Sequence, residues 1–171
     1  MTNETIEHFD VLIVGAGISG IGGAYHLLQE CPDKSFVILE TMDSFGGTWK
    51  THTYPGIRSD SDLYTFGYGF KPWTGPPIAT AQEILDYMGE VIEENDISTH
   101  IRYGHTIETA QWSSSEKRWT LSVKNLEEGR QVEFTCGFLW MCQGYYRHTD
   151  PYTPEWEGMD EFQGTIVHPQ T

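Results

Sequence analysis

Three glycines near the N-terminus follow the pattern G-x-G-x-x-G, in the stretch "GAGISG" at Gly15, Gly17 and Gly20. An apolar run precedes them, a helical pattern follows them, and Glu40 lies twenty residues beyond Gly20. In that context the first glycine permits a tight turn, the second lets the backbone approach a pyrophosphate, and the third lets helix and strand pack closely. The helix N-terminus adds N–H groups and partial positive charge. The pattern predicts a dinucleotide site; the alternative is a turn that only packs a helix on a sheet.

Glu40 bears on which dinucleotide would bind. A carboxylate at the end of the second strand accepts hydrogen bonds from the hydroxyls of an adenosine ribose, and its charge disfavours a 2′-phosphate. FAD or NAD therefore fits this site better than NADP.

The elements around the motif form a βαβ unit. An apolar run rich in β-branched residues predicts a strand over 9–14, apolar residues at helical spacing predict a helix over 19–30, and a second apolar run predicts a strand over 36–39. Residues 41–79 are rich in Gly, Pro and aromatic residues and indicate a long ordered loop. Thr80 and Glu83 have the spacing of a capping box, which predicts the start of a second helix.

The second half of the chain alternates between polar and apolar residues. Runs at 105–112, 118–124 and 131–136, separated by turn residues, predict a three-stranded antiparallel meander. The next run, 137–144, is apolar at consecutive positions and predicts a separate, buried parallel strand. The expected fold class is α/β: a Rossmann-like FAD-binding βαβ domain with an antiparallel β-meander, incomplete at its C-terminal end.

Composition excludes several functions. The chain has 171 residues, enough for one domain, and a net charge of −15, which repels nucleic acid and anionic membrane surfaces. No apolar stretch approaches the roughly 20 residues that span a bilayer, and the acidic N-terminus lacks the pattern of a signal peptide. Three cysteines without a C-x-x-C pair indicate free thiols, no metal site and a cytoplasmic protein.

A second motif decides between the two dinucleotides. The stretch "GGTWKTHTYPGIRSD", residues 46–60, carries a Gly-Gly-x-Trp, an aromatic-Pro-Gly and a final Asp at fixed spacings. It resembles the fingerprint of the Baeyer–Villiger monooxygenases, which belong to the flavin-containing monooxygenases. The longer run "YPGIRSDSDLYTFGYGFKPWTG" and the closing "FQGTIVHPQ" are similar to the branch of that family that activates ethionamide in mycobacteria.

The resemblance implies roles for particular residues. It implies FAD contacts at Gly15, Gly17, Ser19, Gly20, Glu40, Gly47, Thr48, Trp49 and Tyr54. It implies that Arg58 and Asp60 are catalytic, with Ser59 and Asp60 also touching the flavin or the incoming NADPH. It further implies cofactor contacts at Ile107, Gln143 and Gly144. The alternatives are that Trp49 and Tyr54 are core aromatics and that Arg58 and Asp60 form a surface ion pair.

The family's chemistry uses both cofactors. NADPH reduces the FAD, and the reduced flavin and O₂ form a peroxyflavin that turns ketones into esters or oxidises sulfur. The family's second glycine motif, for NADPH, does not occur in these 171 residues. The resemblance therefore implies that residues 1–160 are the N-terminal part of an FAD domain and that 161–171 begin the linker to an NADPH-binding domain outside this chain. Phe162, Gly164 and His168 match the start of the family's linker fingerprint, which makes His168 a hinge-region residue.

Two other functions stay open at this point. The chain could be a stand-alone FAD or nucleotide-binding module, or part of another FAD-dependent oxidoreductase without monooxygenase activity. The expected partners are a ketone or sulfur-containing small molecule, O₂ and the remainder of the same polypeptide, and the chain alone is expected to be inactive.

Overall fold

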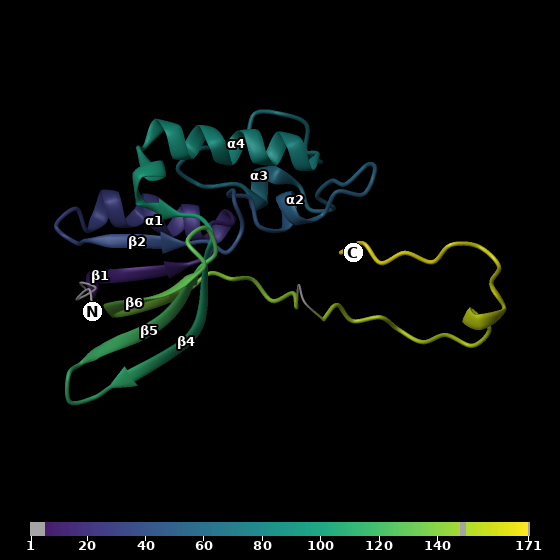
Figure 1. The fold of residues 1–171 in the computed structure, drawn as a ribbon. Helices are drawn as coiled ribbons and strands as arrows, with labels where there is room; N and C mark the ends of the chain where they lie inside the picture. The colour runs from purple at the N-terminus through teal and green to yellow at the C-terminus, as the bar shows by residue number, and fades with distance from the viewer. Residues whose placement is uncertain (1–5, 148–149, 171) are drawn as a thin grey trace.

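A computed structural model describes residues 6–147 and 150–170. Six strands form one mixed sheet in the order β3-β2-β1-β6-β5-β4, and helices α1 and α4 lie together on one side of it (Figure 1). The strands are β1 Glu7–Val14, β2 Phe36–Leu39, β3 Ile101–Arg102, β4 His105–Ser113, β5 Arg118–Asn125 and β6 Arg130–Met141. The helices are α1 Ile18–Glu30, α2 Thr48–Thr51, α3 Leu63–Phe66 and α4 Ala81–Glu94, with 3₁₀ turns at Ile97–His100 and Met159–Glu161.

The predicted βαβ unit is confirmed. β1 pairs with β2 in parallel, Ile13 opposite Ile38, and α1 is the crossover between them. Because side chains alternate along a strand, Val11 and Ile13 join the core beneath the helices, whereas Leu12 faces the opposite side. β1 therefore contributes to two cores, which explains its nearly continuous apolar sequence.

The predicted meander is also confirmed, as β4, β5 and β6 pair antiparallel in sequence order. Its apolar side chains Leu121, Val123 and Phe134 form the second core with Leu12 and Leu39. The meander thus covers the face of the parallel strands that lies away from α1.

The prediction of two separate strands over 131–136 and 137–144 was wrong. One strand, β6, pairs antiparallel with β5 up to Cys136 and in parallel with β1 up to Met141. The run is not buried on both faces either, because Phe138 is 58% exposed and Met141 is 56% exposed. The reason is that β5 ends its pairing at Cys136, so among the described residues 137–141 have only β1 as a neighbouring strand.

The capping box predicted at the start of the second helix is present. The Thr80 hydroxyl accepts from the Glu83 N–H, and the Glu83 carboxylate accepts from the Thr80 N–H at 2.8 Å. The apolar stripe of α4 is buried against α1 and the loop. The ordered loop of residues 41–79 contains two one-turn helices, α2 and α3, and the two-residue strand β3 follows the 3₁₀ turn at 97–100; the sequence predicted none of these three.

The residues after β6 leave the body of the molecule. They run outward past the carboxyl ends of β1 and β6 and then turn back (Figure 1). The returning part touches the outgoing part where a ring nitrogen of His168 lies 3.2 Å from the Tyr152 carbonyl oxygen. The predicted division at residue 160 falls inside this extended arm.

Three further observations concern the part of the chain that the structure describes. No helix there has both the length and the apolar character needed to cross a membrane. No group of three or more His, Cys, Asp or Glu side chains there is arranged to hold a metal ion. Cys31, Cys136 and Cys142 are free thiols, and burial raises the pKa of Cys136 to about 11.

Candidate dinucleotide site

The glycine turn between β1 and α1 leaves no space for side chains at its first and third glycines. Gly15 has φ +97°, and a Cβ there would lie 2.9 Å from the Cys142 carbonyl oxygen. A Cβ on Gly20 would lie 1.9 Å from the Gly15 carbonyl oxygen. The turn is tight and the helix packs directly on it, as the motif predicts.

The second glycine faces another glycine across a narrow gap. A Cβ on Gly47, which has φ +54°, would lie 3.2 Å from the Gly17 Cα. The Gly46 N–H donates to the Ala16 carbonyl oxygen at 3.0 Å and fixes the two loops together. The structure therefore brings the two glycine motifs, thirty residues apart in sequence, into one backbone surface without side chains.

The N-terminus of α1 is open to an anion. Its N-cap residue, Gly17, has no side chain to accept from the N–H groups of the first turn, and that turn has no acidic residue. Ser19 is exposed in the same turn. Uncapped N–H groups and the helix dipole together favour a phosphate at this position.

Glu40 lies at the carboxyl end of β2 and is 9% exposed. One carboxylate oxygen accepts from the Ala16 N–H at 2.7 Å and the other from the Met42 N–H at 2.9 Å. The carboxylate therefore holds the glycine turn, a role that the sequence did not predict. Each carboxylate oxygen has a second lone pair, so acceptance from a ribose hydroxyl is compatible with both bonds.

The predicted flavin-side residues lie on and after α2. Thr48 is exposed at the start of this helix, and Trp49 is half-buried against the core beneath the helices, its ring 6.0 Å from that of Phe66. Tyr54 is 46% exposed. The alternative that these residues are core aromatics therefore holds largely for Trp49, which is half-buried, and not for Tyr54, which is exposed.

The three predicted residues at 58–60 differ in their surroundings. Arg58 and Asp60 are exposed, and among the described residues no ion pair joins them. The Arg58 Nε instead donates to the Gly56 carbonyl oxygen at 3.2 Å. Ser59 is 4% exposed, and its hydroxyl donates to the Ser61 carbonyl oxygen at 2.7 Å. The Ser59 hydroxyl therefore stabilises its own loop, and the side chains of Arg58 and Asp60 are the ones accessible to a ligand.

The first two residues after β6, Cys142 and Gln143, lie against the glycine turn before the chain leaves the body of the molecule. The Cys142 N–H donates to the Val14 carbonyl oxygen at 2.9 Å, and the Gln143 Cα would lie 3.3 Å from a Cβ on Gly15. Gln143 and Gly144 are exposed beside the turn, whereas Ile107 is half-buried in β4 and packs against the meander core. Of these three predicted contacts, Gln143 is brought directly to the turn.

The sequence did not single out Tyr146, although it lies near the predicted flavin-side loop. Its ring centroid is 5.9 Å from that of His52, which is 6.3 Å from Tyr54. A hydrogen bond with Tyr145 raises the pKa of Tyr146, and the charge of Asp60 adds to this rise. The segment after β6 thus approaches the loop that carries Asp60.

Comparison with known proteins shows what this chain is similar to. Residues 13–88 match the family model described as NAD(P)-binding Rossmann-like domain. The chain is 52% identical, over 96% of its length, to the FAD-containing monooxygenase EthA of Mycolicibacterium smegmatis. The chain is thus similar to a part of the FAD-containing monooxygenases. It spans about one third of the length of the curated relatives that it matches, 33% for this one.

Solved structures agree with this homology to FAD-containing monooxygenases. A steroid monooxygenase bound to NADP is 29% identical, with a TM-score of 0.75 over 95% of this chain and 31% of its own. Cyclohexanone monooxygenase from Rhodococcus sp. Phi1, bound to NADP⁺, is 25% identical, with a TM-score of 0.76 over 97% of this chain and 31% of its own. The resemblance predicted from the two motifs is confirmed.

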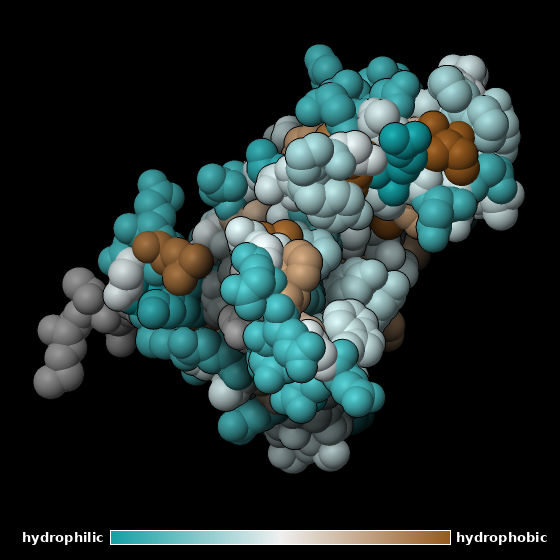
Figure 2. Space-filling view, turned by 90° about the vertical axis from the view of Figure 1, so that its right-hand side faces the viewer, coloured by the Kyte–Doolittle hydropathy of each residue, from teal (hydrophilic) through white to brown (hydrophobic). Residues whose placement is uncertain are grey.

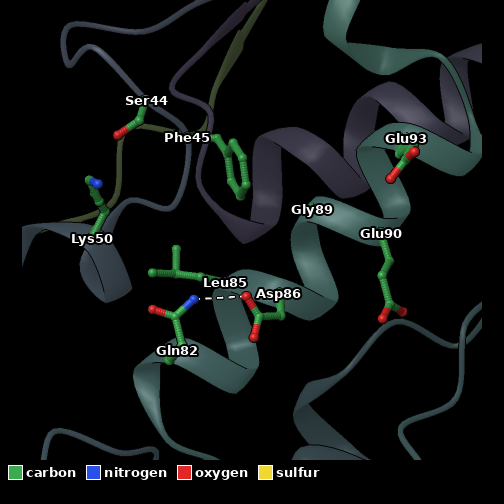
Figure 3. Close-up of a pocket in the computed structure, with 9 residues that line it drawn as sticks. All are labelled: Ser44, Phe45, Lys50, Gln82, Leu85, Asp86, Gly89, Glu90 and Glu93. Atoms are coloured by element: carbon green, nitrogen blue, oxygen red, sulfur yellow. Dashed lines mark hydrogen bonds between the residues drawn. The ribbon is translucent and has the colours of Figure 1, made fainter.

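A pocket of about 440 Å³ lies between α4 and the segment Ser44–Lys50, and no residue of the glycine turn lines it (Figure 3). None of the predicted cofactor residues lines it. Three carboxylates of α4, from Asp86, Glu90 and Glu93, lie along it, and they would repel a pyrophosphate. The side of the molecule toward which the arm after β6 extends shows mostly hydrophilic and intermediate residues, with apolar residues in separate places (Figure 2). The glycine turn remains the site that suits a dinucleotide.

Proposed function

We propose that this chain forms the FAD-binding part of an NADPH- and O₂-dependent flavin monooxygenase that converts ketones to esters or oxidises sulfur compounds. The homology to FAD-containing monooxygenases supports this proposal. The structural observation that carries it is the single surface made by the Gly17 and Gly47 backbones, the open N-terminus of α1 and the buried Glu40 carboxylate.

The residues present fit the adenosine diphosphate half of FAD. A pyrophosphate needs backbone without side chains and unpaired N–H donors, and Gly15, Gly17 and the first turn of α1 supply both. The ribose hydroxyls of FAD need a hydrogen-bond acceptor, and the Glu40 carboxylate can accept from them. In an acidic chain, these local groups overcome the repulsion between the net charge and the cofactor.

Bound FAD supplies the redox chemistry, accepting hydride from NADPH and then reacting with O₂. The chain's own residues would hold and orient it: Thr48 and Trp49 would contact the flavin, and Asp60 and Arg58 would meet the nicotinamide. Both are exposed on one loop, which suits groups that meet a second ligand. We also propose cofactor contacts at Gln143 and Gly144, and at Ser59 and Ile107, whose side chains are engaged in their own loop and in the meander core.

The complete enzyme needs more than this chain. We assign residues 1–160 to the FAD domain and residues 161–171 to the start of the linker toward an NADPH-binding domain, with His168 in the hinge region. The substrate is a small ketone or sulfur compound, and the partner that completes the site is the remainder of the same polypeptide. The proposed setting is cytoplasmic, which the free thiols support.

Oxidation of NADPH by the purified full-length protein tests the proposal. With O₂ and a cyclic ketone or a thioether, we expect NADPH consumption to rise and an ester or a sulfoxide to appear in proportion. FAD-containing protein that consumes no NADPH would contradict the monooxygenase assignment and favour a stand-alone FAD module. Retention of tight FAD by residues 1–171 alone would favour the same alternative.

A further inference from the structure

Two adjacent glycines in α1, Gly22 and Gly23, are not explained by the glycine motif. A Cβ on Gly22 would lie 2.9 Å from a ring carbon of Tyr68, and a Cβ on Gly23 would lie 3.4 Å from the ring of Trp140. The two glycines therefore form a notch in the helix that receives one aromatic ring from the loop after α3 and one from β6. This close approach fixes α1 on two sides.

Tyr68 makes a polar contact as well as a packing contact. Its hydroxyl donates to the carbonyl oxygen of Ile18, the first residue of α1, at 2.7 Å. Its own N–H donates to the Tyr87 hydroxyl of α4 at 2.8 Å, and its ring stacks on Phe70 and Tyr87. Burial raises the pKa of Tyr68, so the hydroxyl stays protonated and remains a donor. Tyr68 thus ties the first turn of α1 to α4.

We propose that Tyr68 is a positioning residue for the pyrophosphate of the cofactor. Its hydroxyl and ring fix the first turn of α1, whose N–H groups have no side-chain cap and would bind the phosphates. A phosphate site made of backbone donors depends on their orientation, because those donors cannot adjust as side chains do. This inference rests on the proposed function, since it assumes that FAD binds at the glycine turn.

The test compares Tyr68→Phe with the wild-type full-length protein at a temperature where circular dichroism shows both to be folded. The variant keeps the ring and loses one hydrogen bond, so we expect FAD to bind about fivefold more weakly. ADP contains the pyrophosphate but no flavin, and its dissociation constant, from isothermal titration, should rise by the same factor. A merely structural role would lower the unfolding temperature without changing either dissociation constant.

Tyr64→Phe is the matched control. Tyr64 lies in α3, and its hydroxyl donates to the Gly75 carbonyl oxygen at 2.8 Å, away from α1. We expect this variant to bind FAD and ADP as the wild type does. If Tyr68→Phe does not fold, Gly22→Ala provides the second variant, because its methyl group displaces the Tyr68 ring and should weaken both ligands.

Three results would overturn the inference. They are unchanged binding of both ligands by folded Tyr68→Phe, weaker FAD with unchanged ADP, and unchanged binding by folded Gly22→Ala. Wild-type protein that binds no FAD would instead contradict the proposed function, so the two failures are distinguishable.

Discussion

Replacing Glu40 by Gln tests whether a buried carboxylate holds the glycine turn. The wild-type side chain accepts two backbone hydrogen bonds, from Ala16 at 2.7 Å and from Met42 at 2.9 Å. An amide of the same shape has one acceptor oxygen and one donor group. One of the two N–H groups would therefore face an NH₂ group instead of an oxygen.

The size of the effect follows from those two bonds. A hydrogen bond to a charged group contributes about 1.5–3 kcal/mol, so the loss of one should lower the free energy of unfolding by about 2 kcal/mol. If the FAD domain unfolds as a unit of about 150–250 residues, that corresponds to a fall of about 4–8 °C in its unfolding temperature. FAD should bind about tenfold more weakly, because the ribose hydroxyls lose a charged acceptor and the turn is less well fixed.

Thermal unfolding of the FAD-free full-length protein, followed by circular dichroism, measures the first effect, and fluorescence titration with FAD measures the second. Glu83→Gln is the control, since its carboxylate also accepts from a backbone N–H but lies at the surface on α4. It should leave FAD affinity unchanged. If Glu40→Gln unfolds within about 1 °C of the wild type, the carboxylate does not hold the turn.

Three further predictions concern charge, packing and catalysis. Hydrogen bonding to Arg102 holds the pKa of Glu7 below its ordinary value of 4.5, so the pair stabilises the folded protein above that pH. The stability difference between wild type and Glu7→Gln, below about 1 kcal/mol at neutral pH, should vanish as the pH falls through the lowered pKa; a difference that persists in acid refutes the pairing. Gly20→Ala should destabilise by about 3 kcal/mol in urea unfolding, whereas Gly69→Ala, with open space around it, should not; equal midpoints would contradict the turn geometry. Asp60→Ala should slow flavin reduction by NADPH in stopped flow while FAD content stays normal, and an unchanged rate would remove Asp60 from the nicotinamide side.

Local patterns predicted the elements that depend on local chemistry. The glycine turn, the crossover helix and the capping box at Thr80 each follow from residue types at fixed spacings, and the structure contains all three. The meander followed from alternation along three short runs. These features depend on contacts between residues that are close in sequence, and such contacts are reflected in the local sequence pattern.

Features that depend on distant contacts were not predictable in this way. The position at which β6 changes its partner strand depends on where the pairing with β5 stops. The sequence of β6 alone does not contain that information. The Glu40 carboxylate accepts from the backbone N–H groups of Ala16 and Met42. The identity of those two residues gives no sign of this, because any residue except proline has a backbone N–H donor. The close approach of Gly17 and Gly47 likewise joins two motifs that are separate in sequence.

The FAD content of purified full-length protein, wild type beside Gly17→Val, tests the central claim most directly. Spectrophotometry after release of the cofactor should find one FAD per wild-type chain. It should find almost none in the variant, whose side chain would fill the space between Gly17 and Gly47. A folded Gly17→Val protein that retains FAD as the wild type does would contradict the assignment of the glycine turn as the cofactor site.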